Sequence, residues 1–242
     1  MKLSDEEKTM LEGQEGFALQ KAMEILVALG EIYGCERMIP VTSAHISGSS
    51  YKGSGSAGSR FVTSLAERGG RFKVPTTLNP LSLDLDNWRQ LGFSEKDCKN
   101  QLATVEAYGK MGCGSACTCT PYLAGNVPAL GDHIAWSESS ALIFANSVLG
   151  ARTNREGGVS ALASGLTGRT PFYGFHTEES RRATVLVENK ACLEADSDYS
   201  ALGYRLGNLL ERDVPFLTGF GRKPTVQALK AFSGGISTCG NV

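Results

Sequence analysis

The sequence lacks the features of a membrane protein or a nucleic-acid-binding protein. Residues 1–7 run directly into charged helical sequence without the apolar core of a signal peptide, and no later apolar run is long enough to span a bilayer. The 24 basic and 25 acidic residues give a net charge of -1, so no overall basic field attracts nucleic acid or an anionic membrane surface. These absences predict a cytoplasmic protein whose partner is a small molecule or another protein.

The sequence also lacks low-complexity tracts and any Pro/Ser-rich linker that would mark a domain boundary. Its 242 residues, 41% of them apolar, suffice for one large domain or two smaller ones. The seven cysteines are an odd number, which suits a disulfide framework poorly and suits thiolate ligands or buried thiols better. We therefore expect a globular chain with reduced cysteines.

Hydrophobic periodicity and capping residues predict alternating helices and strands. Ser4 and Glu7 form a capping box for a short helix that ends at Gly13. The other expected helices are 17–34, 57–68, 85–91, 94–110, 137–149 and 199–212, and the expected strands are 38–46, 71–77 and 183–187. Strands separated by helices of this length favour an α/β fold with a largely parallel sheet, in which ligands bind beyond the carboxyl ends of the strands.

Small residues follow the first two predicted strands. A Gly/Ser loop with one lysine occupies residues 47–56. The second strand is followed by Asn79 and Pro80, which end it. A strand, a small-residue loop and a helix in succession point backbone amides at a bound anion. The loop matches neither the phosphate-loop pattern nor the dinucleotide fingerprint, so a nucleotide fold is not predicted. A flexible loop without a ligand is the alternative interpretation.

Three of the seven cysteines, Cys113, Cys117 and Cys119, lie within seven residues. Such crowding suggests iron or zinc, but three thiolates are one short of a closed zinc site, and the spacing is one residue shorter than the C-x3-C-x2-C pattern of radical enzymes. We expect at most one of Cys117 and Cys119 to bind a given ion. Small buried thiols are the alternative. The remaining cysteines, Cys35, Cys98, Cys192 and Cys239, are predicted to be packed thiols.

Other polar residues give weaker indications. Arg152 and Arg155 present forked donors suited to a carboxylate, and ion pairing with Glu156 at the surface is the alternative. The histidines are scattered along the sequence, so each is predicted to be a core or hydrogen-bonded residue rather than a metal ligand: His45, His133 and His176.

Several separated motifs, taken in order, resemble the aconitase X family. They comprise residues 40–48, 75–80, 117–122, 133–140 and 144–158. The resemblance implies an aconitase-like α/β fold and a hydro-lyase activity. Members of this family divide chiefly between the large subunit of phosphomevalonate dehydratase, in the mevalonate pathway of isoprenoid biosynthesis, and cis-3-hydroxy-L-proline dehydratase. Residues 153–158 are more similar to the first type, with the second as the alternative.

The resemblance also implies a cofactor and site residues. It implies an iron–sulfur cluster, most simply [4Fe–4S], or another iron centre, with Cys119 as ligand, Cys117 as second choice and Cys113 as third. The residues that match the family's substrate-binding loops are Gly48, Ser49, Ser50, Asn79, Pro80 and, more weakly, Ser139. Position 49 departs from the valine found in many relatives. The serine base is expected on a small swivelling subunit, so no catalytic residue is assigned in this chain.

The resemblance covers residues 1–242 as the N-terminal portion of the family's catalytic large subunit, which continues further and supplies additional cluster cysteines. Cys239 matches none of these ligands. A hetero-oligomer with the small subunit is therefore expected. Two other interpretations stay open: a non-catalytic subunit that binds a metal or a ligand, and a structural zinc protein.

Overall fold

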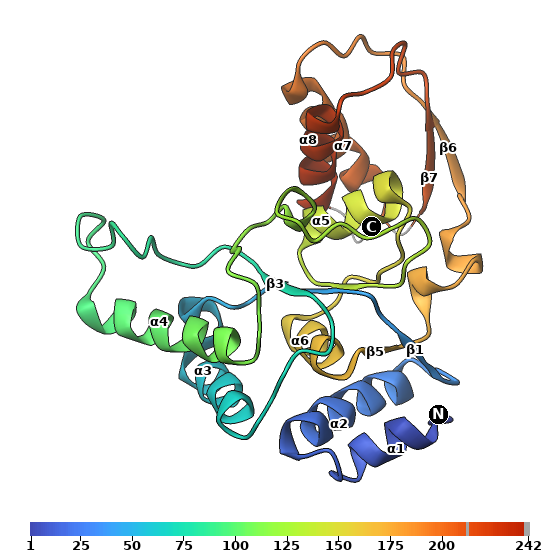
Figure 1. Ribbon diagram of the computed structural model, residues 1–242. Helices are drawn as coiled ribbons and strands as arrows, with labels where there is room; N and C mark the ends of the chain where they lie inside the picture. Colours follow the sequence, from blue (N-terminus) through green and yellow to red (C-terminus); the bar gives the residue numbers. More distant parts are fainter. Residues whose placement is uncertain (212, 240–242) are drawn as a thin grey trace.

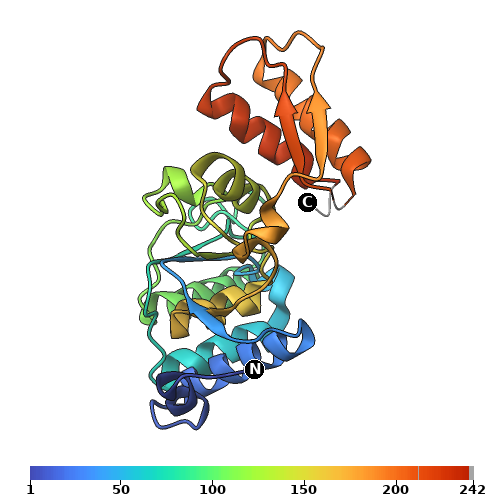
Figure 2. The same ribbon diagram turned by 90° about the vertical axis from the view of Figure 1, so that its right-hand side faces the viewer.

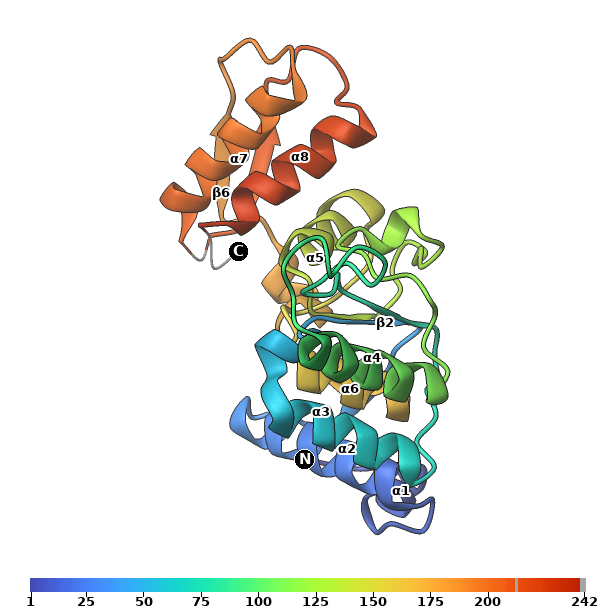
Figure 3. The ribbon, with the colours of Figure 1, turned by 90° about the vertical axis from the view of Figure 1, so that its left-hand side faces the viewer.

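The structure is a computed structural model that describes residues 1–211 and 213–239. It is an α/β protein with two lobes, which Figures 2 and 3 show as a larger lower body and a smaller upper one. The fold class predicted from the sequence is thus confirmed. Among the described residues, no helix is both long and apolar enough to cross a membrane.

A small parallel sheet lies at the centre of the first lobe. Its strands are β2 (Ala44–Ile46), β3 (Thr76–Leu78) and β4 (Ala135–Trp136), in the order β3-β2-β4. Ala44 pairs with Thr76 on one side and with Ala135 on the other. All residues of these strands are buried, as is typical of a parallel sheet covered on both faces.

The cysteine segment extends this sheet at its β3 edge. Cys117 forms a parallel bridge with Leu78, whose amide donates to the Ala116 carbonyl at 3.3 Å. The Thr118 amide donates back to the Leu78 carbonyl at 2.8 Å. The segment therefore runs in the same direction as β3, and Cys119 follows at the carboxyl edge of the sheet.

Helices pack below the sheet and beside it in Figure 3. They are α1 (Asp5–Leu11), α2 (Phe17–Ile32), α3 (Tyr51–Glu67), α4 (Glu95–Lys110) and α6 (Gly158–Thr167). Helix α6 is buried along nearly its whole length because it lies between the sheet and α2. The predicted capping box of Ser4 and Glu7 is confirmed, as is the cap of α4 by Ser94.

Two predicted elements differ from the structure near the site. The expected strand 38–46 divides into β1 (Met38–Pro40), which pairs antiparallel with β5 (Arg169–Pro171), and β2. The Val41 amide donates to the Gly168 carbonyl and the Thr42 amide donates to the His133 carbonyl, so the chain passes from one sheet to the other at this point. Helix α3 begins at Tyr51, inside the predicted Gly/Ser loop, and Gly55 with φ +64° kinks it.

Other boundaries also move. Residues 85–91 form turns instead of the predicted helix, and the second strand is shorter than predicted. The predicted helix 137–149 is α5 (Ser139–Phe144) followed by a π turn (Ala145–Leu149), which ends at Gly150 with φ +70°. The left-handed conformation of Gly150 ends this helix.

The second lobe is one βαβα unit. Strands β6 (Val185–Glu188) and β7 (Pro215–Thr218) are parallel, and helices α7 (Asp196–Leu210) and α8 (Val226–Ser237) pack together beside them (Figure 1). The predicted strand 183–187 and helix 199–212 fall on β6 and α7, except that Arg212 lies outside the described residues.

Candidate functional site

The three parallel strands of the first lobe end at one edge, and the segments that follow them meet there. The Asn79 amide donates to the Ile46 carbonyl at 2.9 Å. Ser137 joins the other side, since its hydroxyl accepts from the Ser47 amide at 2.5 Å and donates to the His45 carbonyl at 2.9 Å. Carboxyl ends of parallel strands are the usual place for a ligand. We call residues 47–50, 79–80, 118–120 and 137–140 the strand-end site.

The structure brings the predicted substrate-binding residues together at this site. Gly48 is exposed with φ +75°, and Ser49 is buried with its hydroxyl 3.2 Å from the Asn79 carbonyl, to which it donates. Ser50 caps α3, since its hydroxyl accepts from the Gly53 amide. Pro80 is exposed beside Asn79, and Ser139 begins α5 after β4. Their contact with a substrate stays a prediction.

Gln101 of α4 supports the loop after β2 and was not found from the sequence. Its side chain is fully buried; the carbonyl oxygen accepts from the Tyr51 amide at 3.0 Å and from the Ser82 hydroxyl at 3.1 Å. Its amide nitrogen donates to the Ser49 carbonyl at 3.2 Å. A glutamine in a helix with many charged neighbours resembles a solvent-exposed residue, so no signal for this role is visible in the sequence.

The clustered cysteines have different surroundings. Cys113 and Cys117 pack against the core of the first lobe, whereas Cys119 is exposed. The Cys113 thiol donates to the Thr76 carbonyl at 3.3 Å. Burial, with a smaller contribution from Cys117, raises the pKa of Cys113 to about 12, and burial also raises the pKa of Cys117. These two thiols therefore stay protonated in the structure, and Cys119 is the accessible thiol of the cluster.

The donor set at the strand-end site is incomplete for a metal cluster. Among residues 1–211 and 213–239, no group of three or more His, Cys, Asp or Glu side chains converges as metal ligands would. Iron–sulfur clusters are held by several thiolates. Cys119 is the one exposed thiol among the residues of the strand-end site, so these residues alone do not fit a whole cluster.

A buried chain of polar side chains also ends at this site. His45 of β2 is fully buried; its Nδ1 lies 2.8 Å from the Thr77 hydroxyl and its Nε2 lies 3.2 Å from Asn79 Oδ1. Asn79 Nδ2 donates to Glu138 Oε2 at 2.6 Å, and Asn126 donates to the Thr77 hydroxyl at 3.0 Å. Burial lowers the pKa of His45, so the ring is neutral. The prediction of a hydrogen-bonded core histidine is confirmed here.

The Gly-rich segment 153–158 runs along the outer edge of β4. The Glu156 amide donates to the Trp136 carbonyl at 3.2 Å, and a Cβ on Gly158 would lie 2.2 Å from the Ser47 carbonyl, so this position requires glycine. The Glu156 carboxyl is buried rather than at the surface; it accepts from the Ser160 hydroxyl at 2.5 Å. Burial raises the pKa of Glu156. Arg152 forms an ion pair with Glu178.

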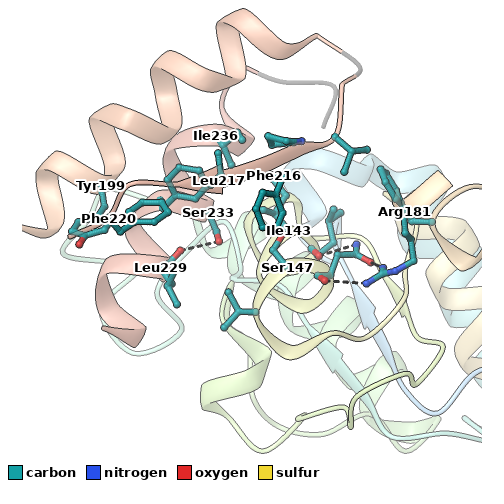
Figure 4. A pocket seen from close by; sticks show the side chains of 17 residues that line it. Ile143, Ser147, Arg181, Tyr199, Phe216, Leu217, Phe220, Leu229, Ser233 and Ile236 are labelled. Carbon is teal, nitrogen blue, oxygen red and sulfur yellow. Dashed lines mark hydrogen bonds between the residues drawn. The ribbon is translucent and has the colours of Figure 1, made fainter. Parts of the chain in front are cut away.

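A separate cavity of about 380 Å³ lies between the two lobes (Figure 4). It is mostly apolar, with Ile143 of α5 on one side and Phe216 and Phe232 of the second lobe on the other. Arg181 lies at its edge and donates to the Asn146 side chain at 2.7 Å. None of the predicted substrate-binding residues lines this cavity.

Fold and geometry together define an α/β protein with a candidate ligand site at the carboxyl edge of a parallel sheet. Two family models assign it more closely: the Aconitase X first domain matches residues 1–179, and the Aconitase X second domain matches residues 183–242. The chain belongs to the aconitase X family. The family predicted from the sequence is thus confirmed, and the two models divide the chain at a place that the sequence analysis did not mark as a boundary.

The chain is similar to phosphomevalonate dehydratase large subunits. It is 51% identical to that of Methanothermobacter thermautotrophicus, over 98% of this chain and 59% of the relative, and 49% identical to that of Thermococcus kodakarensis, over 100% and 60%. The crystal structure of Thermococcus kodakaraensis aconitase X in its holo-form matches with a TM-score of 0.90 at 47% identity, covering 99% of this chain and 60% of the other. The chain thus spans about 60% of the length of these relatives.

A second group of relatives is more distant. The cis-3-hydroxy-L-proline dehydratase of Pseudomonas aeruginosa is 38% identical over 98% of this chain and 41% of the relative. The relatives in both groups are dehydratases by name. Their names agree with the class of enzyme that the sequence predicted.

Proposed function

We propose that this chain forms the first two domains of a dehydratase large subunit that removes water from (R)-5-phosphomevalonate and yields anhydromevalonate phosphate. The strand-end site carries this proposal, because it gathers the two predicted substrate loops and the exposed Cys119 at one edge. The choice of substrate follows the identities: four phosphomevalonate dehydratase large subunits are 44–51% identical over nearly the whole chain, against 36–38% for the hydroxyproline enzymes.

The two loops provide donors for an anionic substrate. Helix α3 begins at Tyr51 directly after the Gly48 loop, and α6 begins at Gly158 against Ser47. Amides at helix N-termini favour phosphate and carboxylate groups. Asn79 adds a side-chain amide from the next strand. We assign the phosphate and carboxylate of the substrate to this set of donors.

Cys119 would hold one corner of an iron–sulfur centre, whose further thiolates must come from outside the described residues. When bound, such a centre supplies a Lewis acid that makes the substrate hydroxyl a better leaving group. The similar relatives are named large subunits, which supports a small-subunit partner. In this proposal the partner removes the proton, and this chain binds and orients the substrate.

The test compares Cys119→Ser with Cys192→Ser, which changes another exposed thiol in the second lobe. Both variants are made in the assembled enzyme with its small subunit, purified without oxygen. We expect Cys119→Ser to abolish dehydration of phosphomevalonate and to lower bound iron and sulfide, whereas Cys192→Ser retains both. Full activity of Cys119→Ser would remove the proposed ligand.

The same preparation distinguishes the alternatives. Faster turnover of cis-3-hydroxy-L-proline than of phosphomevalonate would change the substrate and keep the reaction type. Binding of phosphomevalonate without turnover of either compound would indicate a non-catalytic subunit. Zinc without iron or sulfide in the purified protein would indicate a structural metal site.

A further inference from the structure

The hydrogen-bond chain behind the strand-end site has one direction that the chemistry allows. The Glu138 carboxylate only accepts hydrogen bonds, so the Asn79 atom 2.6 Å from it is the Nδ2 donor. The opposite orientation of the amide would place Asn79 Oδ1 against a carboxylate oxygen, which is repulsive. Asn79 Oδ1 therefore faces His45 Nε2, 3.2 Å away.

This orientation fixes the tautomer of His45. Because Asn79 Oδ1 only accepts, His45 Nε2 carries the proton and Nδ1 is an acceptor. The Thr77 hydroxyl, 2.8 Å from Nδ1, must then donate to it. That hydroxyl in turn accepts from Asn126 Nδ2 at 3.0 Å. Every donor thus points the same way, from Asn126 through Thr77, His45 and Asn79 to Glu138.

The hydrogen-bonded side chains that precede Asn79 are held in place. His45 has no exposed surface and lies edge-on to the Trp136 ring, with the ring centroids 6.0 Å apart. Asn126 is also anchored by a bond from Nδ2 to the Ala44 carbonyl at 3.1 Å. A ring so enclosed does not reach a ligand. Its effect on the site passes through Asn79, which is half-buried.

Asn79 keeps a limited capacity for a ligand. One Nδ2 hydrogen is bonded to Glu138 and one acceptor direction of Oδ1 is used by His45, so one N–H remains. Glu138 is bonded on both sides, since its Oε1 accepts from the Ser140 hydroxyl at 3.3 Å. A paired carboxylate repels a nearby anion less than an unpaired one because its charge is spread over the donors.

We infer that His45 and Glu138 are positioning residues for substrate binding: together they hold the Asn79 amide in one orientation, so that its remaining N–H is offered to an oxygen of the anionic substrate. The identity of the substrate in this inference rests on the proposed function. The orientation of Asn79 is independent of that function. An amide free to rotate would offer its oxygen to the substrate for part of the time and would bind it less well.

The first measurement needs no activity. Nitrogen NMR of the histidine rings reports which ring nitrogen of His45 carries the proton. We expect the Nε2–H form in the wild-type chain and in Glu138→Gln, since glutamine keeps an acceptor oxygen for Asn79. In Glu138→Ala the amide is released, and we expect a mixture of the two tautomers. An unchanged single tautomer in Glu138→Ala would overturn the inference.

The second measurement uses the assembled enzyme with phosphomevalonate as substrate. Loss of one hydrogen bond to an anion corresponds to about a tenfold weaker interaction. We expect Glu138→Ala to raise KM about tenfold with a smaller change in kcat, and Glu138→Gln to stay within about threefold of wild type. Asn79→Asp opposes two carboxylates and should raise KM more than Glu138→Ala does.

Two controls separate the possible failures. Glu188→Gln changes an exposed carboxylate of β6 in the second lobe and should alter neither KM nor the His45 tautomer. If Glu138→Gln lost kcat as severely as Glu138→Ala at unchanged KM, Glu138 would act on the reacting atoms, and the positioning role would be wrong. If wild type showed no turnover at all, the proposed function would fail, and the tautomer measurement alone would decide the orientation of Asn79.

Discussion

Both lobes contain parallel strands, and among residues 1–211 and 213–239 the candidate site lies at the strand ends of the first lobe. In the first lobe, three strands and the bridged cysteine segment end side by side, and each following segment bonds to its neighbour. In the second lobe two strands, β6 and β7, end together, and Asn189 after β6 donates from its backbone amide to the Thr218 carbonyl and from its side chain to the Gly219 carbonyl. The sheet of the first lobe thus brings more strand ends together at one edge than the sheet of the second lobe does.

The lobes also differ in how their sheets are covered. Val187 of β6 and Leu217 of β7 pack toward α7 and α8, whereas Leu186 is 69% exposed and Phe216 is 60% exposed on the opposite face. The first lobe's sheet is buried throughout. The second lobe therefore depends mainly on the contact between its two helices, and the first on a core with buried polar groups.

The largest predicted effect concerns that helix contact. A Cβ on Gly235 of α8 would lie 2.1 Å from the Ser200 carbonyl of α7, whereas Gly234 has open space around it. We expect Gly235→Ala to destabilise the second lobe by about 3 kcal/mol, because the helix backbones must separate. Hydrogen exchange measures the two lobes separately and should show the loss only in the second.

Gly234→Ala is the matched control, one residue away in the same helix. It should be neutral or stabilising by up to about 1 kcal/mol, since alanine favours a helix interior over glycine. Equal destabilisation by both variants would mean that α7 and α8 do not pack as closely as described.

The second prediction concerns the stability of the first lobe at acid pH. All three histidines, His45, His133 and His176, belong to this lobe, and burial lowers the pKa of each, that of His176 to about 3. The unfolded chain takes up these protons near pH 6.5 and the folded chain does so only at lower pH, so stability is full above pH 6.5 and falls below it. His176 alone should cost about 2 kcal/mol at pH 5.

Amide exchange at pH 7 and pH 5, corrected for intrinsic rates, checks this difference between the lobes. We expect the first lobe to lose protection and the second to change little. His176→Gln should reduce the pH dependence of the first lobe. An equal loss of protection in both lobes would contradict the assignment to histidine burial.

The third prediction concerns Glu156, whose titration changes the stability of the first lobe with pH in the opposite direction to that of the histidines. Burial raises its pKa, so its contribution to stability is full below pH 4.5 and is lost as the pH rises through the folded value. Glu156→Gln keeps an acceptor for the Ser160 hydroxyl and removes the buried charge. It should stabilise the first lobe more at pH 8 than at pH 5. Urea unfolding at both pH values measures this; no difference between them would contradict a raised pKa of Glu156 in the folded chain.

Local patterns in the sequence predicted the local features of this fold. The caps of Ser4 and Ser94 predicted two helix starts. The different surroundings of Cys117, which packs against the core, and Cys119, which is exposed, do not follow from the two-residue period of a strand, because residues two apart share a face. The loops at the ends of β2 and β3 were found because small residues follow apolar runs. By contrast, the strand 38–46 was predicted as one piece because the change of sheets depends on partners more than 90 residues away.

The support of the site could not be predicted from the sequence for the same physical reason. Asn79 and Glu138 are 59 residues apart, and His45 and Asn79 are 34 apart. No local pattern distinguishes a glutamate that receives such a bond from one that faces solvent. The candidate loops were therefore within reach of sequence analysis, whereas the residues that orient them required the fold.

The smallest predicted effect tests the uncovered face of the second lobe. Leu186 and Val187 are neighbours on β6 with side chains on opposite faces. Leu186→Thr removes apolar area that is already largely in water, so the second lobe should change by less than about 0.5 kcal/mol. Val187→Ala removes a side chain that packs toward α7 and α8 and should cost about 1 to 2 kcal/mol. If Leu186→Thr cost as much as Val187→Ala in hydrogen exchange, the face that carries Leu186 would be covered in solution, and the contrast between the two sheets would not hold.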